Sequence, residues 1–214
     1  MAAARGGGIV TPAKRLFDLV LAVFLSVLLA PLLVGLAVAM LIRQGRPVLH
    51  VSERMRAPGR AFALVKLRTM APPPDGVDSG VSGADKAARI TPMGLWLRRR
   101  RLDEIPQLWN VLRGDMSFVG PRPPLRVYVE RFPDLYARVL ECRPGLTGLA
   151  TLVYHGHEER LLARSRSAAE TDAIYARLCV PRKARLDLIY RRNRSVCFDA
   201  VLLWRTAARV WRRS

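Results

Sequence analysis

The residues best suited to chemistry are concentrated in one short stretch of the chain. Four consecutive arginines, Arg98–Arg101, precede the carboxylate pair Asp103 and Glu104. An ionised carboxylate can attack phosphorus and form an acyl phosphate, and Mg²⁺ prefers one or two carboxylates together with substrate phosphates. We therefore expect phosphoryl chemistry at Asp103, which the arginines and the start of the following helix should keep ionised. Glu104 is expected to act as a second metal ligand or as a base.

This carboxylate pair also has a simpler interpretation. Acidic residues at the start of a helix often do no more than cap it. A run of arginines is commonly a solvated or lipid-facing patch. The pair alone therefore does not establish catalysis, and other phosphate-binding residues have to support it.

Three further basic residues could bind phosphate. Pro121 and Pro123 fix the backbone on either side of Arg122 and so preset the direction of its side chain. A guanidinium group can bind phosphate through two parallel hydrogen bonds. Lys66 and Arg68 lie at the end of a predicted strand and are candidates for the same role. Exposed basic residues in structural loops are the alternative.

Length and composition narrow the class of protein. The 214 residues suffice for one domain with an anchor. The 36 Lys and Arg residues outnumber 17 acidic residues, so the net charge of +19 favours a polyanionic partner: nucleic acid, an anionic bilayer or a phosphorylated small molecule. Aromatic residues make up only 7% and fall mostly on apolar faces, which argues against base stacking. The three cysteines lack metal-ligand spacing and are expected to be free thiols.

An uncharged apolar segment runs from Leu19 to Ile42. It exceeds the ~20 residues needed to cross a bilayer and is too long for a cleavable signal. Pro31 predicts a kink near its middle. Basic residues flank both ends, and such flanks prefer the cytoplasm. The residues alone favour an ordinary kinked span, and the alternative is a helix that enters, bends at Pro31 and returns.

The remaining elements follow from periodicity and turn signals. A Pro58-Gly59 turn predicts a β-hairpin between Pro47 and Met70, and a loop over residues 71–88 follows it. Apolar residues at i, i+3, i+4 and i+7 predict a helix from Ile105 that ends at Gly114. Further helices are expected near residues 125–142 with a break at Pro133, 158–178, 184–192, and after Ser195. Trp204 and Trp211 on the basic C-terminal helix favour the membrane interface, although a packed core helix fits equally well.

Three motifs occur in the order VKLRTM, then ARITPMGLWLRRRRLDEIPQLWNVLRGDMSFVGPRP, then RPGLTGLA. Together they closely resemble the bacterial sugar transferase family, the small monotopic phosphoglycosyl transferases. The resemblance begins at the KRLFD segment of residues 14–18 and covers nearly the whole chain. It implies an α+β fold with a flexible N-terminus (1–13), a re-entrant membrane anchor (14–43), and a mainly helical catalytic domain with a short hairpin and interfacial helices (44–214). The domain is expected on the cytoplasmic face of the bacterial inner membrane.

The resemblance also implies an activity. A sugar phosphate would pass from a nucleotide-diphosphate sugar, expected to be a UDP-sugar, to polyprenyl phosphate by way of a phospho-aspartate and with Mg²⁺. This reaction opens surface glycan or exopolysaccharide synthesis. Asp103 matches the family nucleophile and Mg²⁺ ligand, with Glu104 in support. Lys66, Arg98 and Arg122 match its phosphate-binding residues. Membrane lipid is an expected partner and nucleic acid is not. The oligomeric state stays open, with a homo-oligomer as one alternative.

The chain departs from the family pattern at several positions. Ala30-Pro31 replaces the Ser-Pro pair at which the family anchor bends. Arg101 stands where Ser or Thr is common, and Thr151 replaces Gln. The segment YHGHEER, residues 154–160, is unlike the expected sequence, and its histidines are expected in an exposed loop because no third metal ligand is evident. The donor sugar and the nucleotide base therefore stay open, and the rival functions are a single-span scaffold and a membrane-tethered nucleic-acid binder.

Overall fold

The computed structural model describes residues 10–72 and 84–213. The predicted flexible N-terminus and the predicted loop over residues 71–88 therefore lie largely outside the described residues. The order of elements starts with the helix α1 (Pro12–Gln44), the strands β1 (Leu49–Ala57) and β2 (Arg60–Leu67), the 3-10 helix η1 (Ala84–Arg89), α2 (Pro92–Arg99), the 3-10 helix η2 (Leu102–Gln107), α3 (Leu108–Arg113) and β3 (Ser117–Val119). It continues with α4 (Arg126–Arg131), α5 (Pro133–Val139), β4 (Gly145–Thr147), α6 (Leu149–Leu162), α7 (Ala168–Ile174), a π-helical turn η3 (Tyr175–Cys179), α8 (Val180–Asn193) and α9 (Val196–Arg213).

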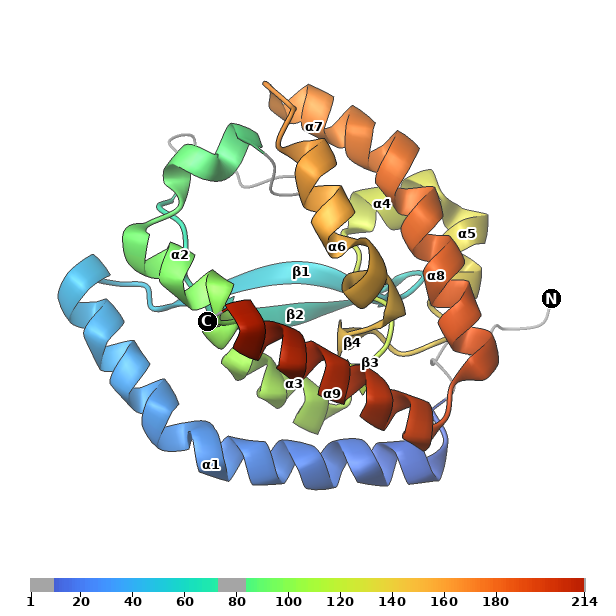
Figure 1. Cartoon of the computed structure of the whole chain (residues 1–214), viewed down its shortest axis with the longest axis horizontal. Coiled ribbons are helices and arrows are strands. Elements are labelled where there is room, and N and C mark those ends of the chain that lie inside the picture. Colours follow the sequence, from blue (N-terminus) through green and yellow to red (C-terminus); the bar gives the residue numbers. More distant parts are fainter. Residues whose placement is uncertain (1–9, 73–83, 214) are drawn as a thin grey trace.

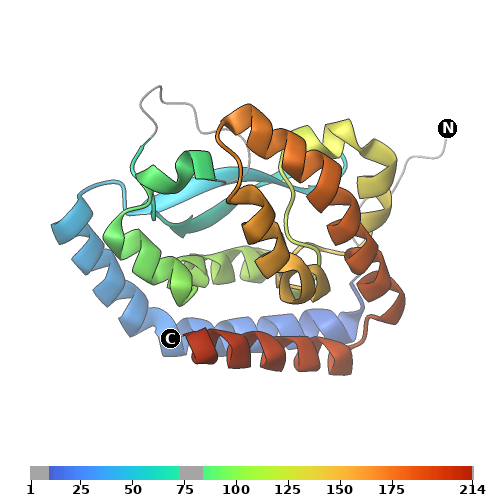
Figure 2. The ribbon, with the colours of Figure 1, turned by 45° about the horizontal axis from the view of Figure 1, so that its top comes forward.

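The β-hairpin lies at the centre of the molecule. Its strands pair antiparallel around the Pro58-Gly59 turn, where Gly59 has a φ of +71°. In Figure 1, α2 and α3 flank the hairpin on one side and the helices α4 to α8 cover the other. Turned by 45°, the same ribbon shows α1 and α9 side by side along one edge (Figure 2). The predicted α+β class and the predicted hairpin are confirmed.

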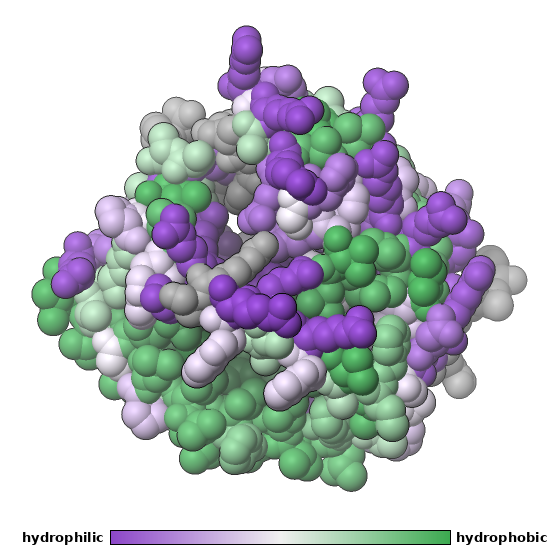
Figure 3. Space-filling model, viewed as in Figure 1, coloured by the Kyte–Doolittle hydropathy of each residue, from purple (hydrophilic) through white to green (hydrophobic). Residues whose placement is uncertain are grey.

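The helix α1 bends near its middle, as the proline at position 31 predicts (Figure 1). It is long and apolar enough to cross a membrane, and only 11% of its most apolar window is buried. Large apolar side chains are exposed along its length, among them Val20, Phe24, Val27, Val34 and Val38. In Figure 3 the apolar surface gathers over this part of the molecule. The domain therefore leaves one face of α1 without protein cover.

The first turns of α1 are fastened to the domain by buried polar contacts. Asp18 is fully buried and accepts hydrogen bonds from Ser117 Oγ at 2.6 Å and from the Phe118 N–H at 3.2 Å. Arg15 donates to two carbonyl oxygens at the end of α3, at 2.7 and 2.8 Å. Lys14 forms an ion pair with a carboxylate of α9. The charges of the KRLFD segment thus hold the start of α1 against β3, α3 and α9.

The far end of α1 is fastened to the same domain. Arg68 donates to the Gln44 and Gly45 carbonyl oxygens at 2.7 and 3.0 Å. Thr91 Oγ1 donates to Gln44 Oε1 at 3.1 Å. Buried apolar side chains of α1, β2 and α2 pack together here: Leu36, Met40, Leu67 and Leu97. Both ends of the apolar helix therefore meet one compact domain.

The parallel pair β3–β4 was not predicted, because three-residue strands carry almost no periodic signal. It brings the GPRP and RPG segments into direct backbone contact. Gly120 N donates to the Thr147 carbonyl at 2.9 Å, and Gly145 N donates to the Pro121 carbonyl at 2.8 Å. A Cβ on Gly120 would lie 2.2 Å from the Arg143 carbonyl oxygen. The glycines are needed because the two paired backbones approach each other too closely for a Cβ atom, and this close contact fixes the backbone just before Arg122.

Several predicted boundaries were wrong. The helix predicted over residues 158–178 is two helices, α6 and α7, separated by a break after residue 162, and α6 begins at Leu149. His155 and His157 therefore lie on a helix and not in an exposed loop. The break at Pro133 is confirmed, and α8 begins four residues earlier than predicted. The three cysteines are free thiols, as expected.

Candidate active site

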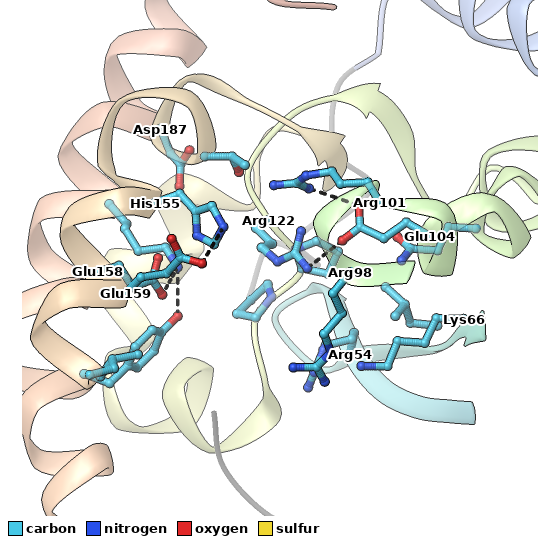
Figure 4. Close-up of a pocket in the computed structure, with 18 of the residues that line it drawn as sticks. Arg54, Lys66, Arg98, Arg101, Glu104, Arg122, His155, Glu158, Glu159 and Asp187 are labelled. Carbon is cyan, nitrogen blue, oxygen red and sulfur yellow. Dashed lines mark hydrogen bonds and ion pairs between the residues drawn. The ribbon is translucent and has the colours of Figure 1, made fainter. Parts of the chain in front are cut away.

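A pocket of about 510 Å³ opens between the hairpin side of the domain and the helices α5, α6 and α8. This volume is within the range of roughly 300–1,000 Å³ that small-molecule sites occupy. Figure 4 shows two groups of side chains facing each other across it. One group is mainly basic and comes from β1, β2, α2, η2 and the 121–124 loop: Arg54, Lys66, Arg98, Arg101, Asp103, Glu104 and Arg122. The other is rich in carboxylates and comes from the helices: His155, Glu158, Glu159, Lys183 and Asp187.

Asp103 lies in the basic group, on the 3-10 helix η2. Only 8% of the residue is exposed, and within the described residues its carboxylate accepts no hydrogen bond. Burial and the neighbouring Glu104 raise its pKa above the ordinary range, and Lys66, Arg98 and Arg122 offset part of that shift. The arginines therefore offset only part of the effect of burial on this pKa, and the ionised state of Asp103 stays a prediction. A six-residue 3-10 helix provides little dipole, and loss of hydration outweighs it.

Glu104 is fully engaged in holding two arginines. Its Oε1 accepts from Arg122 Nη2 at 2.9 Å, and its Oε2 accepts from Arg101 Nη1 at 3.1 Å. Burial raises its pKa, but Arg122 and Arg101 together outweigh burial and hold the pKa below the usual range. Both oxygens are thus occupied, and the arrangement makes Glu104 a support for the arginines rather than a base or a second metal ligand.

The basic residues come from separated parts of the chain. Lys66 at the end of β2 is largely buried, and burial together with Arg98 and Arg122 lowers its pKa to about 8. Arg98 donates through Nε to Thr69 Oγ1 at 2.8 Å, which fixes it beside the end of β2. Arg101 occupies the left-handed region, with φ of 55°, in the tight turn between α2 and η2. This turn directs Arg98 and Asp103 into one pocket.

Two predicted phosphate-binding residues lie elsewhere. Arg68 is not among the pocket-lining residues, because it holds the end of α1 through the two carbonyl contacts described above. Pro121 also lies outside the lining, and its carbonyl oxygen accepts from Gly145 N in the contact between the β3 and β4 segments. Pro123 lines the pocket. Lys66, Arg98, Arg122, Asp103 and Glu104 are brought together as predicted. Ala30 and Pro31 lie within α1 and take no part in the pocket.

The carboxylate-rich wall was missed by sequence reasoning. Lys183 Nζ donates to Glu158 Oε1 at 2.9 Å and to the Tyr175 hydroxyl at 3.2 Å. His155 Nε2 lies 3.4 Å from Glu159 Oε1. The unusual 154–160 segment was the one available signal, since it marked this stretch as different. Helical periodicity could not show that α6 and α8 turn these side chains toward Asp103.

The carboxylates of the pocket fit Mg²⁺ only if the substrate supplies most of its ligands. Among residues 10–72 and 84–213, no three His, Cys, Asp or Glu side chains are grouped to hold a metal. Among these residues the Asp103 carboxylate accepts no hydrogen bond, while Glu104 is bound to Arg101 and Arg122. Mg²⁺ is commonly held by a single carboxylate together with substrate phosphates. The site therefore suits a cation that arrives with a diphosphate, with Asp103 as its protein ligand.

Comparisons with known proteins show which family the chain belongs to. The sequence model of the bacterial sugar transferase family matches residues 9–213, so the chain belongs to that family. It is 44% identical over 168 residues to the UDP-glucose:undecaprenyl-phosphate glucose-1-phosphate transferase of Caulobacter vibrioides, with 75% of this chain and 62% of that protein covered. It is 34% identical over 203 residues to the undecaprenyl-phosphate glucose phosphotransferase of Komagataeibacter xylinus, with 92% and 35% covered. The undecaprenyl-phosphate galactose phosphotransferase of Salmonella typhimurium is 35% identical over 150 residues, with 64% and 31% covered. The chain thus spans between about a third and three fifths of these relatives' length.

Proposed function

We propose that this protein transfers a sugar phosphate from a nucleotide-diphosphate sugar to polyprenyl phosphate, and that Asp103 is the nucleophile. The observation that carries the proposal is a buried carboxylate in a pocket lined by Lys66, Arg98 and Arg122, which accepts no hydrogen bond from the part of the chain that the structure describes. A carboxylate so placed is surrounded by groups suited to phosphoryl oxygens. The names of the relatives support the two substrates.

The reaction would proceed in two displacements. The Asp103 carboxylate attacks the sugar-linked phosphorus, an O–P bond forms, and the bond to the nucleoside monophosphate breaks. An oxygen of the lipid phosphate then attacks the same phosphorus, and the aspartyl O–P bond breaks to restore the carboxylate. Arg98, Arg122 and protonated Lys66 hold the phosphoryl oxygens in both steps. Bound Mg²⁺ would supply charge neutralisation of the diphosphate.

Glu104 contributes by positioning. Because it binds Arg101 and Arg122 at once, it fixes two guanidinium groups in the pocket next to Asp103. Its charge also compensates part of the local excess of positive charge before the donor binds. The two arginines then need no rearrangement when the phosphates arrive.

The membrane arrangement follows from the attachment of α1. A straight 33-residue helix would be about 50 Å long and would carry one end away from the domain. Here both ends contact the same domain, and the bent, exposed apolar face lies between them. We infer that α1 enters one leaflet and returns, so that the domain stays on the cytoplasmic face with its pocket near the lipid headgroups. The Ser-Pro pair is therefore not required for the bend, and Pro31 with Ala30 suffices.

The test uses the full chain in detergent or native membranes. UDP-glucose, Mg²⁺ and undecaprenyl phosphate are supplied, and release of UMP is followed. Asp103→Asn is expected to abolish UMP release, whereas Asp134→Asn, an exposed aspartate on α5, serves as the matched control and keeps it. Intact-protein mass spectrometry after incubation with donor alone should show one added sugar phosphate that Asp103→Asn lacks. Full UMP release by Asp103→Asn would remove Asp103 as nucleophile.

The two rival functions make opposite predictions. A single-span scaffold would place the two ends of α1 on opposite sides of the membrane, so a cysteine reagent that does not cross membranes would label them from different sides. The nucleic-acid binder would retain DNA in a salt-dependent manner. We expect both ends of α1 to be labelled from the cytoplasmic side and DNA retention to be absent.

A further inference from the structure

The helical wall of the pocket holds a buried carboxylate that the proposed reaction does not use. Asp187 on α8 is 6% exposed and lines the pocket. Its Oδ1 atom is buried and accepts no hydrogen bond within the described residues. A buried carboxylate oxygen without a partner is costly, because its hydration is lost and nothing replaces it. A ligand hydroxyl or amide that donates to this oxygen would remove that cost.

The residues around Asp187 extend the polar wall toward the basic group. Glu158 on α6 and Lys183 on α8 form an ion pair whose side chains are only 16% and 14% exposed. Figure 4 shows His155, Glu158, Glu159 and Asp187 on the side of the pocket opposite Lys66, Arg98 and Arg122. The pocket is thus divided by charge, with a phosphate-binding side and a side that offers carboxylate acceptors.

We propose that this second side is the sugar subsite, in which Asp187 and Glu158 accept hydrogen bonds from the hydroxyls of a neutral hexose. The inference rests on the proposed function and goes on to assign specificity. Sugar hydroxyls are strong donors, and a carboxylate can accept two of them. Glu158, Glu159 and Asp187 on this wall favour a neutral sugar over an acidic one such as a uronic acid. Burial raises the pKa of Asp187 to about 7, so near neutrality its carboxyl group can also donate.

The two displacements explain why the sugar, rather than the nucleoside, would occupy the enclosed wall. The nucleoside monophosphate must leave after the first step, and the lipid phosphate must then reach the same phosphorus. The sugar phosphate stays bound through both steps. A second groove lies next to the pocket, between the arginines at the end of α2, the helix α6 and the helix α9, and α9 lies beside α1. Arg98, Arg101, His155 and Glu159 line both the pocket and this groove. Exchange of nucleotide for lipid can use this groove while the hexose stays beside Asp187 on α8, which lines the pocket but not the groove.

The first measurement is binding, which does not depend on turnover. Affinities for UDP and for UDP-glucose, UDP-galactose and UDP-N-acetylgalactosamine are measured calorimetrically on the full chain in detergent. The wild type should bind one of these UDP-sugars more tightly than UDP, and Asp187→Ala should lose about 10- to 100-fold of that affinity, the effect of a hydrogen bond to a charged group. UDP affinity should change less than twofold. Asp187→Asn, which keeps one acceptor oxygen and the side-chain shape, should lose less.

The second measurement matches the enzyme variant with an altered donor. Deoxy analogues of the preferred UDP-sugar each lack one hydroxyl. One of them should bind wild type about as weakly as the full donor binds Asp187→Ala, and that analogue should show no further loss with the variant. Arg185→Gln, an exposed position on the same helix, is the control and should leave every affinity unchanged.

The outcomes separate this inference from the proposed function. Equal losses of Asp187→Ala for UDP and for every UDP-sugar would overturn the sugar subsite, as would a wild type that binds no UDP-hexose more tightly than UDP. If the sugar-dependent loss is found while UMP release is absent, the proposed transfer fails and the subsite stands. If UMP release is normal and the loss does not depend on the sugar, the transfer stands and the subsite fails.

Discussion

Replacement of Asp18 tests how strongly α1 is joined to the domain. The carboxylate is fully buried and accepts from Ser117 Oγ and the Phe118 N–H. Asp18→Ala removes both acceptors and leaves two buried donors without partners. Hydrogen bonds to charged groups contribute ~1.5–3 kcal/mol each, so the expected loss is about 3–6 kcal/mol, against a total stability of ~5–15 kcal/mol. Asp18→Asn keeps one acceptor oxygen and should lose about half as much.

Thermal unfolding in detergent, followed by tryptophan fluorescence, measures this loss. For a chain of this size, 1 kcal/mol corresponds to roughly 2–4 °C in Tm, so Asp18→Ala should melt on the order of 10 °C below wild type. UMP release should fall as well, because β3 leads directly into the turn that holds Arg122. Asp134→Ala on the surface is the control. A Tm within about 2 °C of wild type for Asp18→Ala would show that Asp18 meets only lipid or water, and the account of a docked anchor would be wrong.

Three further predictions concern the pocket and its supports. If protonated Lys66 binds phosphate, kcat/KM for the donor should fall as pH rises through about 8, and Lys66→Arg should shift that limb upward because guanidinium stays charged. Glu104→Gln removes a charge that raises the pKa of Asp103, so the acidic limb of the pH–rate profile should move to lower pH. The maximal rate should fall, because Arg101 and Arg122 lose the carboxylate that holds them. An acidic limb that does not move would count against Asp103 as the titrating group. Gly120→Ala introduces a Cβ 2.2 Å from a carbonyl oxygen, so it should lower the yield of folded protein. A melting curve like that of the wild type would contradict the close contact between the β3 and β4 segments.

Much of the fold could be predicted from local patterns. The Pro58-Gly59 turn between two extended segments indicates the hairpin, and a long segment without charged residues indicates the apolar helix. These features depend on residues close together in the chain, so a window of about 20 residues contains the information. The three-residue strands β3 and β4 could not be found in this way, because their pairing joins segments almost 30 residues apart.

The residues of the candidate site could also be predicted in part, because residue types and motifs are local features of the chain. Residue types and motif order identified Asp103, Lys66, Arg98 and Arg122, and the structure brings them into one pocket. The electrostatic balance could not be read in advance. Loss of hydration raises the pKa of Asp103 more than the neighbouring basic residues lower it, and this burial comes only from the fold.

By itself, the sequence determined the kinds of groups available: a carboxylate pair, an excess of arginine, a rigid Pro-Arg-Pro turn and an apolar segment with a proline near its middle. Only the tertiary structure decided what each group does. It assigned Glu104 to two arginines, tied both ends of α1 to one domain, and placed Asp187 in the lining of the same pocket as Lys66, Arg98 and Arg122. The physical reason is the distance along the chain over which each effect acts. Residue type and local propensity act over one or two turns, whereas burial, ion pairing and the direction of a side chain depend on which distant segments pack together.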